Sequence, residues 1–305
     1  MSIVISGTGL FTPPESISND ELVACFNSYV DKFNSDNELA IENGAVTALA
    51  HSSSAFIEKA SGIKSRYVMS KSDILNVEVM KPTFVERPNE TLSMQAEIGV
   101  AAAKQAMAAA NKTAADIDLV IVACAYTQRS YPAMAIEIQQ ALGCAGWGFD
   151  MLVACSAATF GIINAANAVR SGTAKTVLVI NPEILTPQIN YRDRDSHFIF
   201  GDVATASIIE DESTATGEHQ FRIIAEQPIT EFSNNIRSNI GYMNQCSPDT
   251  AADVDKYFIQ QGRKVFKEVL PMVSNLIAAQ MDKVELEQKD IKRLYLHQAN
   301  INMNN

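Results

Sequence analysis

Short runs of apolar residues alternate along this chain with longer segments of helical composition. An unbroken apolar run is typical of a strand that is buried on both faces of a sheet. Buried strands are predicted at residues 3–9, 119–124 and 176–181, and after a turn within residues 200–209; the run at 119–124 is unbroken. Helices are predicted at residues 22–33, 91–110 and 133–142. The alternation predicts an α/β fold, in which residues 119–124 form a doubly buried strand of the kind found in parallel sheets.

The segment from Asp150 to Arg170 is the most informative part of the pattern. It begins with an apolar approach and continues as a helix of small residues, which predicts a central helix with neighbours on all sides. Cys155 lies at the junction, where the first amides of a helix carry partial positive charge and favour a thiolate. Cys155 is therefore a candidate nucleophile. The alternative is a small, buried and inert cysteine.

The pattern restarts after a polar boundary at residues 211–218. A short strand is predicted at 221–225, a long helical region at 254–281, and an acidic turn followed by a strand that ends at His297. This order resembles that of residues 115–122 in the first part. We therefore predict two similar halves, residues 1–210 and 220–305, of which the second stops early. Chance similarity is the alternative, because helix, turn and strand often follow one another.

Composition and charge narrow the possible functions. The 305 residues are 47% hydrophobic and 19% charged, which is typical of a globular protein with a large core. The net charge of −11 argues against general nucleic-acid binding. We find no signal segment and no apolar run long enough to span a membrane, so the expected location is the cytoplasm. The five cysteines have neither disulfide-framework nor zinc spacing, so no metal is expected.

A second chemical candidate is the tetrapeptide from His297 to Asn300. A histidine at the end of a buried strand can act as a base or as a hydrogen-bond donor. Alone, this tetrapeptide is weak evidence for an active-site histidine. The evidence is stronger because Cys155 precedes it by about half of a duplicated fold.

With both candidates in place, the chain resembles the β-ketoacyl-acyl-carrier-protein synthase III family of thiolase-fold condensing enzymes. The matching segments extend along nearly the whole chain. They are Ile5-Ser-Gly-Thr-Gly9 with Pro13, Gly62-Ile63 with Arg66, Pro88-Asn-Glu-Thr91, Ser130-Tyr-Pro132, Ala154-Cys155-Ser156, Phe200-Gly-Asp202 and His297-Gln-Ala-Asn300. The resemblance implies a five-layer αβαβα fold with two pseudo-duplicated halves, a homodimer, and a Cys-His-Asn active site in which Cys155 accepts the acyl group and His297 promotes decarboxylation.

The resemblance also implies binding roles. Arg194 corresponds to an arginine that contacts the adenine of CoA, Phe56 to the aromatic residue that stacks there, and Tyr131 to an aromatic that reaches across the dimer to the acyl pocket. The basic residues Arg263, Lys264 and Lys267 lie on the helix that receives the acidic carrier protein. An ordinary solvated helix face explains these three equally well.

Some positions depart from the family pattern. The family's catalytic asparagine belongs to a Gly-Asn-Thr-Ser segment that does not occur in this chain, nor does the glycine-rich C-terminal loop. We expect the chain to be a fragment of a longer protein, the alternative being a truncated and inactive one. A second CoA-contacting arginine is replaced by Ala60, and a carrier-contacting arginine by Asn302. Inserts near residues 34–55 and 69–87 predict an acyl pocket for primers longer than acetyl.

The expected reaction is therefore the first condensation of fatty-acid synthesis. An acyl-CoA primer and malonyl-acyl-carrier protein would give 3-oxoacyl-acyl-carrier protein, CoA and CO₂. No cofactor is expected, because the acyl-CoA and the malonyl carrier protein are substrates. A starter-unit acyltransferase of a secondary-metabolite pathway and a non-catalytic acyl-CoA-binding homologue are the alternatives.

Overall fold

A computed structural model describes residues 1–304 of the chain. The strands are β1 (Ile3–Phe11), β2 (Glu15–Ser18), β3 (Ser65–Val68), β4 (Leu119–Cys124), β5 (Trp147–Leu152), β6 (Thr176–Ile184), β7 (Asp202–Asp211), β8 (Phe221–Ile223), β9 (Ile236–Arg237) and β10 (Ile259–Gln260). The helices are α1 (Asn19–Asp36), α2 (Glu38–Glu42), α3 (Ser54–Ser61), α4 (Met94–Ala109), α5 (Met134–Leu142), α6 (Ala157–Arg170), α7 (Gly262–Lys283) and α8 (Ile301–Asn304).

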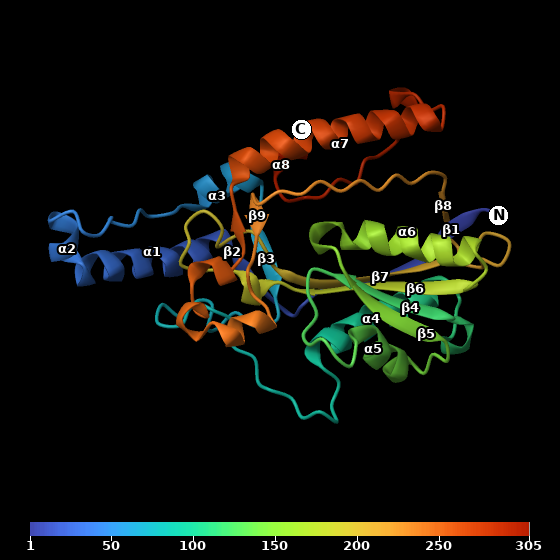
Figure 1. Cartoon of the computed structure of the whole chain (residues 1–305), viewed down its shortest axis with the longest axis horizontal. Helices are drawn as coiled ribbons and strands as arrows, with labels where there is room; N and C mark the ends of the chain where they lie inside the picture. The colour runs from blue at the N-terminus through green and yellow to red at the C-terminus, as the bar shows by residue number, and fades with distance from the viewer. Residues whose placement is uncertain (305) are drawn as a thin grey trace.

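A mixed sheet with the order β5-β4-β6-β7-β1-β8 forms the centre of the described chain. Strands β5, β4 and β6 are parallel, whereas β7, β1 and β8 pair antiparallel to their neighbours. Helices α4 and α5 cover one face and α6 covers the other (Figure 1). The predicted buried strands and α/β class are thus confirmed.

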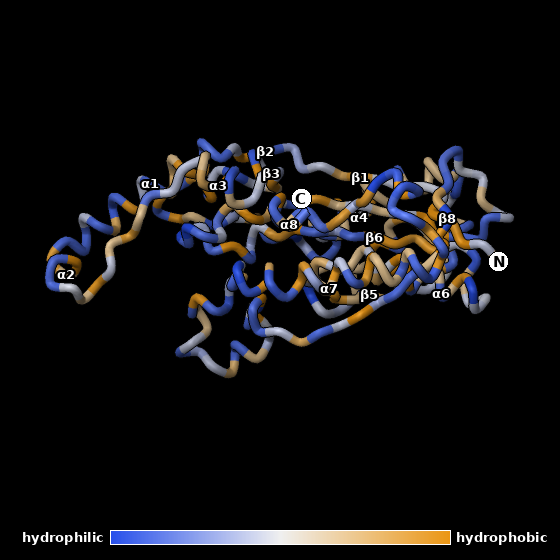
Figure 2. Tube along the Cα trace, turned by 90° about the horizontal axis from the view of Figure 1, so that it is seen from above, coloured by the Kyte–Doolittle hydropathy of each residue, from blue (hydrophilic) through white to orange (hydrophobic). Residues whose placement is uncertain are grey.

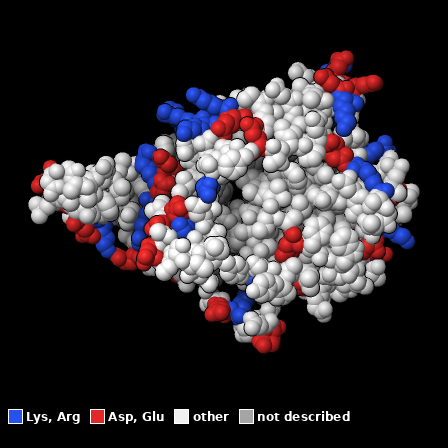
Figure 3. Space-filling model, viewed as in Figure 1, with Lys and Arg blue, Asp and Glu red and all other residues white. Residues whose placement is uncertain are grey.

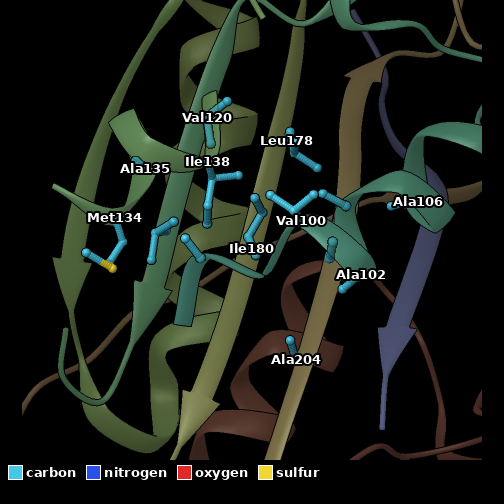
Figure 4. Packing of buried hydrophobic residues seen from close by; sticks show 14 of the residues in the cluster. Val100, Ala102, Ala106, Val120, Met134, Ala135, Ile138, Leu178, Ile180 and Ala204 are labelled. Carbon is cyan, nitrogen blue, oxygen red and sulfur yellow. The ribbon is translucent and has the colours of Figure 1, made fainter. Parts of the chain in front are cut away.

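Alternate residues of β4 explain why both faces need a cover. Val120 and Val122 pack in the cluster beneath α4 and α5, while Leu119 and Ile121 pack in the cluster beneath α6. Successive side chains of a strand point to opposite faces, so an unbroken apolar run buries both. Figure 4 shows Val120, Leu178 and Ile180 of the sheet facing side chains of α4 and α5.

The central helix α6 approaches the sheet closely at Gly161. A Cβ atom added there would lie 2.8 Å from Val179 Cγ1 and 3.1 Å from Ala123 Cβ, so only glycine fits without movement. The expectation of neighbours on every side is wrong for the residues that the structure describes. Ala158 and Asn164 on the outer face of α6 are exposed, because packing is confined to the side that faces the sheet.

A third apolar cluster lies beside the sheet and joins α1, α3, the antiparallel pair of β2 and β3, and the loop at 185–200. The Ser18–Glu21 capping box starts α1 as the sequence predicts, but the helix continues to Asp36. The end of α1 and the short helix α2 extend away from the rest of the chain in both views (Figures 1 and 2). The first insert, at 34–55, therefore contains this projecting arm.

The C-terminal part is packed more loosely. Strand β8 joins the edge of the first sheet, β9 and β10 pair with each other, and α7 has no buried residue. The strand predicted before His297 is wrong: the described residues 291–297 are irregular, and Leu294 and Tyr295 are exposed. A strand needs a neighbour for its backbone donors and acceptors, and none pairs with this segment within residues 1–304. The predicted division into two halves stays a prediction.

No described helix combines the length and the apolar character needed to cross a bilayer.

Candidate active site

Cys155 lies in a tight turn between β5 and α6. The turn begins where the Val153 N–H donates to the carbonyl oxygen of Cys124 at 3.3 Å. Ala154 then adopts a φ of +45°, in the left-handed region that is costly for a residue with a side chain. A single 3₁₀ turn, Ala154–Ser156, leads into α6. Cys155 is exposed, whereas Cys25, Cys124 and Cys144 are buried, so this turn presents its residue outward as a nucleophile requires.

The electrostatic environment of Cys155 differs from the prediction. Although the residue is exposed overall, crowding of the thiol by protein atoms raises its pKa, and the negative charge of Glu183 raises it further. The thiol's contact with its own backbone N–H opposes these effects. The expectation that the helix terminus favours the thiolate is thus outweighed by desolvation and by a neighbouring carboxylate.

His297 lies in the irregular segment that precedes α8. Burial of the ring lowers the pKa of its imidazole and so favours the neutral form, although the residue as a whole is exposed. Within residues 1–304, no hydrogen bond joins the Cys155 thiol to this ring. Helix α8 packs on α3, where Asn302 Nδ2 donates to the Lys59 carbonyl at 3.2 Å. The structure thus places the histidine segment beside α3, and the Cys-His pairing stays a prediction.

The two residues that the resemblance assigns to CoA are in direct contact. The Arg194 guanidinium lies 4.1 Å from the centroid of the Phe56 ring, and its Nε donates to the carbonyl of His51 at 2.8 Å. Phe56 also packs edge-on against Phe198, with centroids 6.3 Å apart. Helix α3 and the loop at 190–200 thereby meet through this stack, and the Arg194 guanidinium also lies 3.6 Å from the carboxylate of Asp195.

Tyr131 is 81% exposed and lines a cavity of about 780 Å³ together with residues 84–89 and Tyr126. The second insert therefore contributes to a cavity wall. Another cavity, of about 720 Å³, lies between the loop at 126–130, Leu152 and residues 240–257. The first insert lines neither of these two cavities.

The three predicted carrier-docking residues, Arg263, Lys264 and Lys267, are exposed at the start of α7. Figure 3 shows a cluster of basic side chains over this end of the helix. The structure therefore keeps the three charges together on one accessible surface.

Glu183 is a site residue that the sequence analysis missed. It is the penultimate residue of β6, and burial raises the pKa of its carboxyl to about 7. An acidic residue at the carboxyl end of a buried parallel strand is the signal that could have identified it. Within the described residues, no group of three or more histidine, cysteine or acidic side chains is arranged to hold a metal.

Comparisons with known proteins agree on one family. A family model described as 3-Oxoacyl-[acyl-carrier-protein (ACP)] synthase III matches residues 149–228. The chain is 52% identical over 279 residues to a Beta-ketodecanoyl-[acyl-carrier-protein] synthase of Pseudomonas aeruginosa, covering 92% of this chain and 80% of the relative. A Beta-ketoacyl-[acyl-carrier-protein] synthase III of Bartonella henselae is 27% identical over 301 residues, 97% of this chain and 77% of the relative.

A solved structure gives the same result for the fold. The 3-oxoacyl-[acyl-carrier-protein] synthase III of Aquifex aeolicus superimposes with a TM-score of 0.72 at 23% identity, over 99% of this chain and 78% of that one. The predicted thiolase-like fold class is confirmed by this match.

Proposed function

The chain belongs to the 3-oxoacyl-[acyl-carrier-protein] synthase III family of acyl-transferring condensing enzymes, and on this premise we propose that Cys155 accepts the acyl group of an acyl-CoA primer. The observation that carries the assignment is the turn at Ala154, which exposes this cysteine at the start of α6. The other exposed cysteine, Cys246, ends the 3₁₀ turn Tyr242–Cys246 and does not stand at the start of an α-helix.

The reaction proceeds in two transfers. The Cys155 sulfur attacks the thioester carbonyl, the C–S bond to CoA breaks, and the CoA sulfur leaves with the thiol proton. The malonyl thioester then loses CO₂, and its enolate carbon attacks the acyl-Cys155 carbonyl. The C–S bond to the enzyme breaks, and protonation restores the thiol. A neutral His297 suits this step, because it can donate a hydrogen bond to the enolate oxygen without bringing a second anion.

We assign the primer to the medium-chain acyl-CoAs. The Pseudomonas relative is named for a ketodecanoyl product, and malonyl supplies two of those ten carbons, which leaves an eight-carbon primer for that enzyme. The cavity of about 720 Å³ offers space for a similar primer here, because it reaches Leu152, three residues before Cys155. Its lining combines apolar side chains such as Ile240 with charged ones such as Arg129 and Asp253.

CoA and the carrier protein occupy different surfaces in this proposal. The adenine stacks at Phe56 and Arg194, which are already stacked on each other. The carrier protein docks at Arg263, Lys264 and Lys267, because an acidic partner is attracted by three exposed positive charges on one helix end.

We further propose a homodimer formed through β5. This strand is at the sheet edge, and within the described residues no other strand pairs with its outer side. Trp147 on β5 and Tyr131 in the adjoining loop are both exposed, so the edge offers backbone groups together with large apolar surfaces. Size-exclusion chromatography with light scattering measures the mass. A monomeric mass would contradict this assembly.

The cytoplasmic location stays a prediction.

The central test is a mass measurement on the full chain incubated with octanoyl-CoA. The expected product carries one octanoyl group on Cys155, and a Cys155→Ala variant carries none, whereas Cys246→Ala is acylated like the parent. Addition of malonyl-acyl-carrier protein should then release 3-oxodecanoyl carrier protein and CO₂. Simple transfer of octanoyl to the carrier identifies a starter-unit acyltransferase instead. Absence of the acyl adduct contradicts both enzymatic assignments.

A further inference from the structure

The end of β4 lies between two functional segments. In the parallel register, Val122 of β4 is opposite Ile180 of β6, and Cys124 is opposite Leu152 of β5. Ala125 and Glu183 follow these strand positions, and the Ala125 N–H donates to both Glu183 carboxylate oxygens at 3.0 and 3.2 Å. Glu183 thus holds the backbone immediately after β4.

The peptide unit between Cys124 and Ala125 also contacts the turn that carries Cys155, through its carbonyl group. The carbonyl of Cys124 accepts the Val153 N–H at 3.3 Å, and the strained Ala154 follows. A hydrogen-bonded path therefore leads from Glu183 through Ala125, Cys124 and Val153 to Cys155. Because residues with positive φ persist only where the surroundings determine them, the turn depends on this fixed strand end.

The other carboxylates near this edge are better compensated. Asp150 on β5 accepts the N–H groups of Met134 and Ala135 at 2.7 and 2.8 Å. Asp202 on β7 accepts from the backbone and hydroxyl of Thr186 and from Met69.

Glu183, by contrast, accepts only from Ala125 within the described residues and forms no ion pair there. The titratable groups that its charge acts on are Cys124 and Tyr126, from β4 and its loop, and Cys155, none of which carries positive charge. Its ionised form is therefore the least stabilised at this edge, which agrees with its pKa of about 7.

We propose that Glu183 is a positioning residue for Cys155, because its carboxylate fixes the strand end that supports the cysteine turn. A negative charge on this carboxylate also acts against ionisation of the Cys155 thiol. This inference rests on the proposed role of Cys155 as the acyl acceptor. Neutral Glu183 leaves the thiol easier to ionise, and ionised Glu183 makes ionisation harder. The glutamate thus limits how steeply the reactivity of Cys155 rises with pH.

Three variants in a Cys246→Ser background test the inference, so that Cys155 is the one exposed cysteine. Glu183→Gln keeps the length and the acceptor but removes the charge, whereas Glu183→Leu removes both. Glu218→Gln removes one charge at an exposed position of the 211–218 boundary and is the matched control. The measurements are circular dichroism and thermal melting to verify folding, the rate of iodoacetamide alkylation from about pH 6 to about pH 9, and octanoyl transfer from octanoyl-CoA.

We expect Glu183→Gln to be alkylated about threefold faster than the parent near pH 8, equivalent to about half a pH unit in the thiol midpoint, with the two rates converging near pH 6. Glu218→Gln should match the parent throughout. Glu183→Leu should reduce kcat for octanoyl transfer by about tenfold with little change in KM, because the turn loses its support. Glu183→Gln should keep kcat within about twofold of the parent near pH 6.

Alkylation rates of Glu183→Gln that equal those of the parent near pH 8 would overturn the electrostatic part. Equal transfer rates for the glutamine and leucine variants would overturn the positioning part. If Glu183→Gln and the parent differ in alkylation rate near pH 8 but the parent accepts no octanoyl group, the inference about Glu183 is supported and the proposed function is contradicted. The two failures are therefore distinguishable.

Discussion

The guanidinium of Arg194 stacks on the ring of Phe56, with its central carbon 4.1 Å from the ring centroid. The two residues are far apart in the sequence and come from α3 and from the loop before β7. The stack joins an aromatic face to a delocalised cation, the combination that suits a flat, electron-rich base. It is therefore the part of the molecule where an adenine would find both a surface to stack on and a positive charge.

Replacement of Arg194 by alanine should weaken acyl-CoA binding without affecting the carrier substrate. We expect the KM for octanoyl-CoA to rise about tenfold, equivalent to about 1.4 kcal/mol, because a stacking and cationic contact is lost. Arg192→Ala is the matched control, since Arg192 lies over a different ring, that of Tyr29, at 5.4 Å. Steady-state kinetics with each substrate varied in turn measures the effect. Equal KM changes for both variants would contradict the assignment.

Charge reversal at the start of α7 should impair use of the carrier protein. We expect the double variant Lys264→Glu, Lys267→Glu to lower kcat/KM for malonyl-acyl-carrier protein by about tenfold at low salt, with a smaller effect as salt screens the charges. Lys283→Glu, at the other end of the same helix, is the control. Unchanged kinetics in the double variant would identify these lysines as an ordinary solvated helix face.

A side chain at Gly161 should destabilise the packing of α6 on the sheet. Gly161→Val places branched atoms where even a Cβ is 2.8 Å from Val179 Cγ1, so helix and sheet must separate. We expect the free energy of unfolding to fall by about 1–3 kcal/mol, as is typical of overpacked cores. Urea denaturation measures the change, and Asn164→Val on the exposed outer face of α6 should cost much less. Equal losses for both variants would show that helix propensity, and not packing, is responsible.

The sequence predicts this fold best where a pattern reports a local environment. The apolar runs of β4 and β6 identify buried strands, because only a strand covered on both faces has no polar positions. The glycine and alanines after Cys155 identify a helix close to the sheet. The strand predicted before His297 does not form, because an extended segment becomes a strand only where another strand pairs with it. A local pattern does not report that partner.

The chemistry of Cys155 depends on neighbours that no local pattern reveals. Its position at a helix start is readable from the sequence, and that position alone favours a thiolate. Glu183 lies 28 residues further along the chain, and it reaches the cysteine only because β4 separates β6 from β5. The sign of the pKa shift therefore follows from the strand order, which the sequence analysis did not derive.

A buried histidine makes the stability of this protein depend on pH. His197 is fully buried, its ring is stacked on Phe26 at 4.7 Å, and Nδ1–H donates to the carbonyls of Asp193 and Arg194 at 3.0 Å. Nε2 has no partner within the described residues. Burial lowers the pKa of the ring to about 4, and the charge of the nearby Arg66 adds to the effect.

The unfolded chain therefore binds a proton at His197 more readily than the folded chain does, and acid should destabilise the fold. The folded-state pKa is below the unfolded value of about 6.5, so stability is complete above about pH 6.5 and decreases as the pH falls toward about 4. We expect His197 to account for a loss of about 2–3 kcal/mol over that interval, measured by urea denaturation at several pH values. His197→Asn keeps an N–H donor but does not titrate, so its unfolding free energy should fall less steeply with acid. Parallel pH profiles for the variant and the parent would assign the acid sensitivity to other groups.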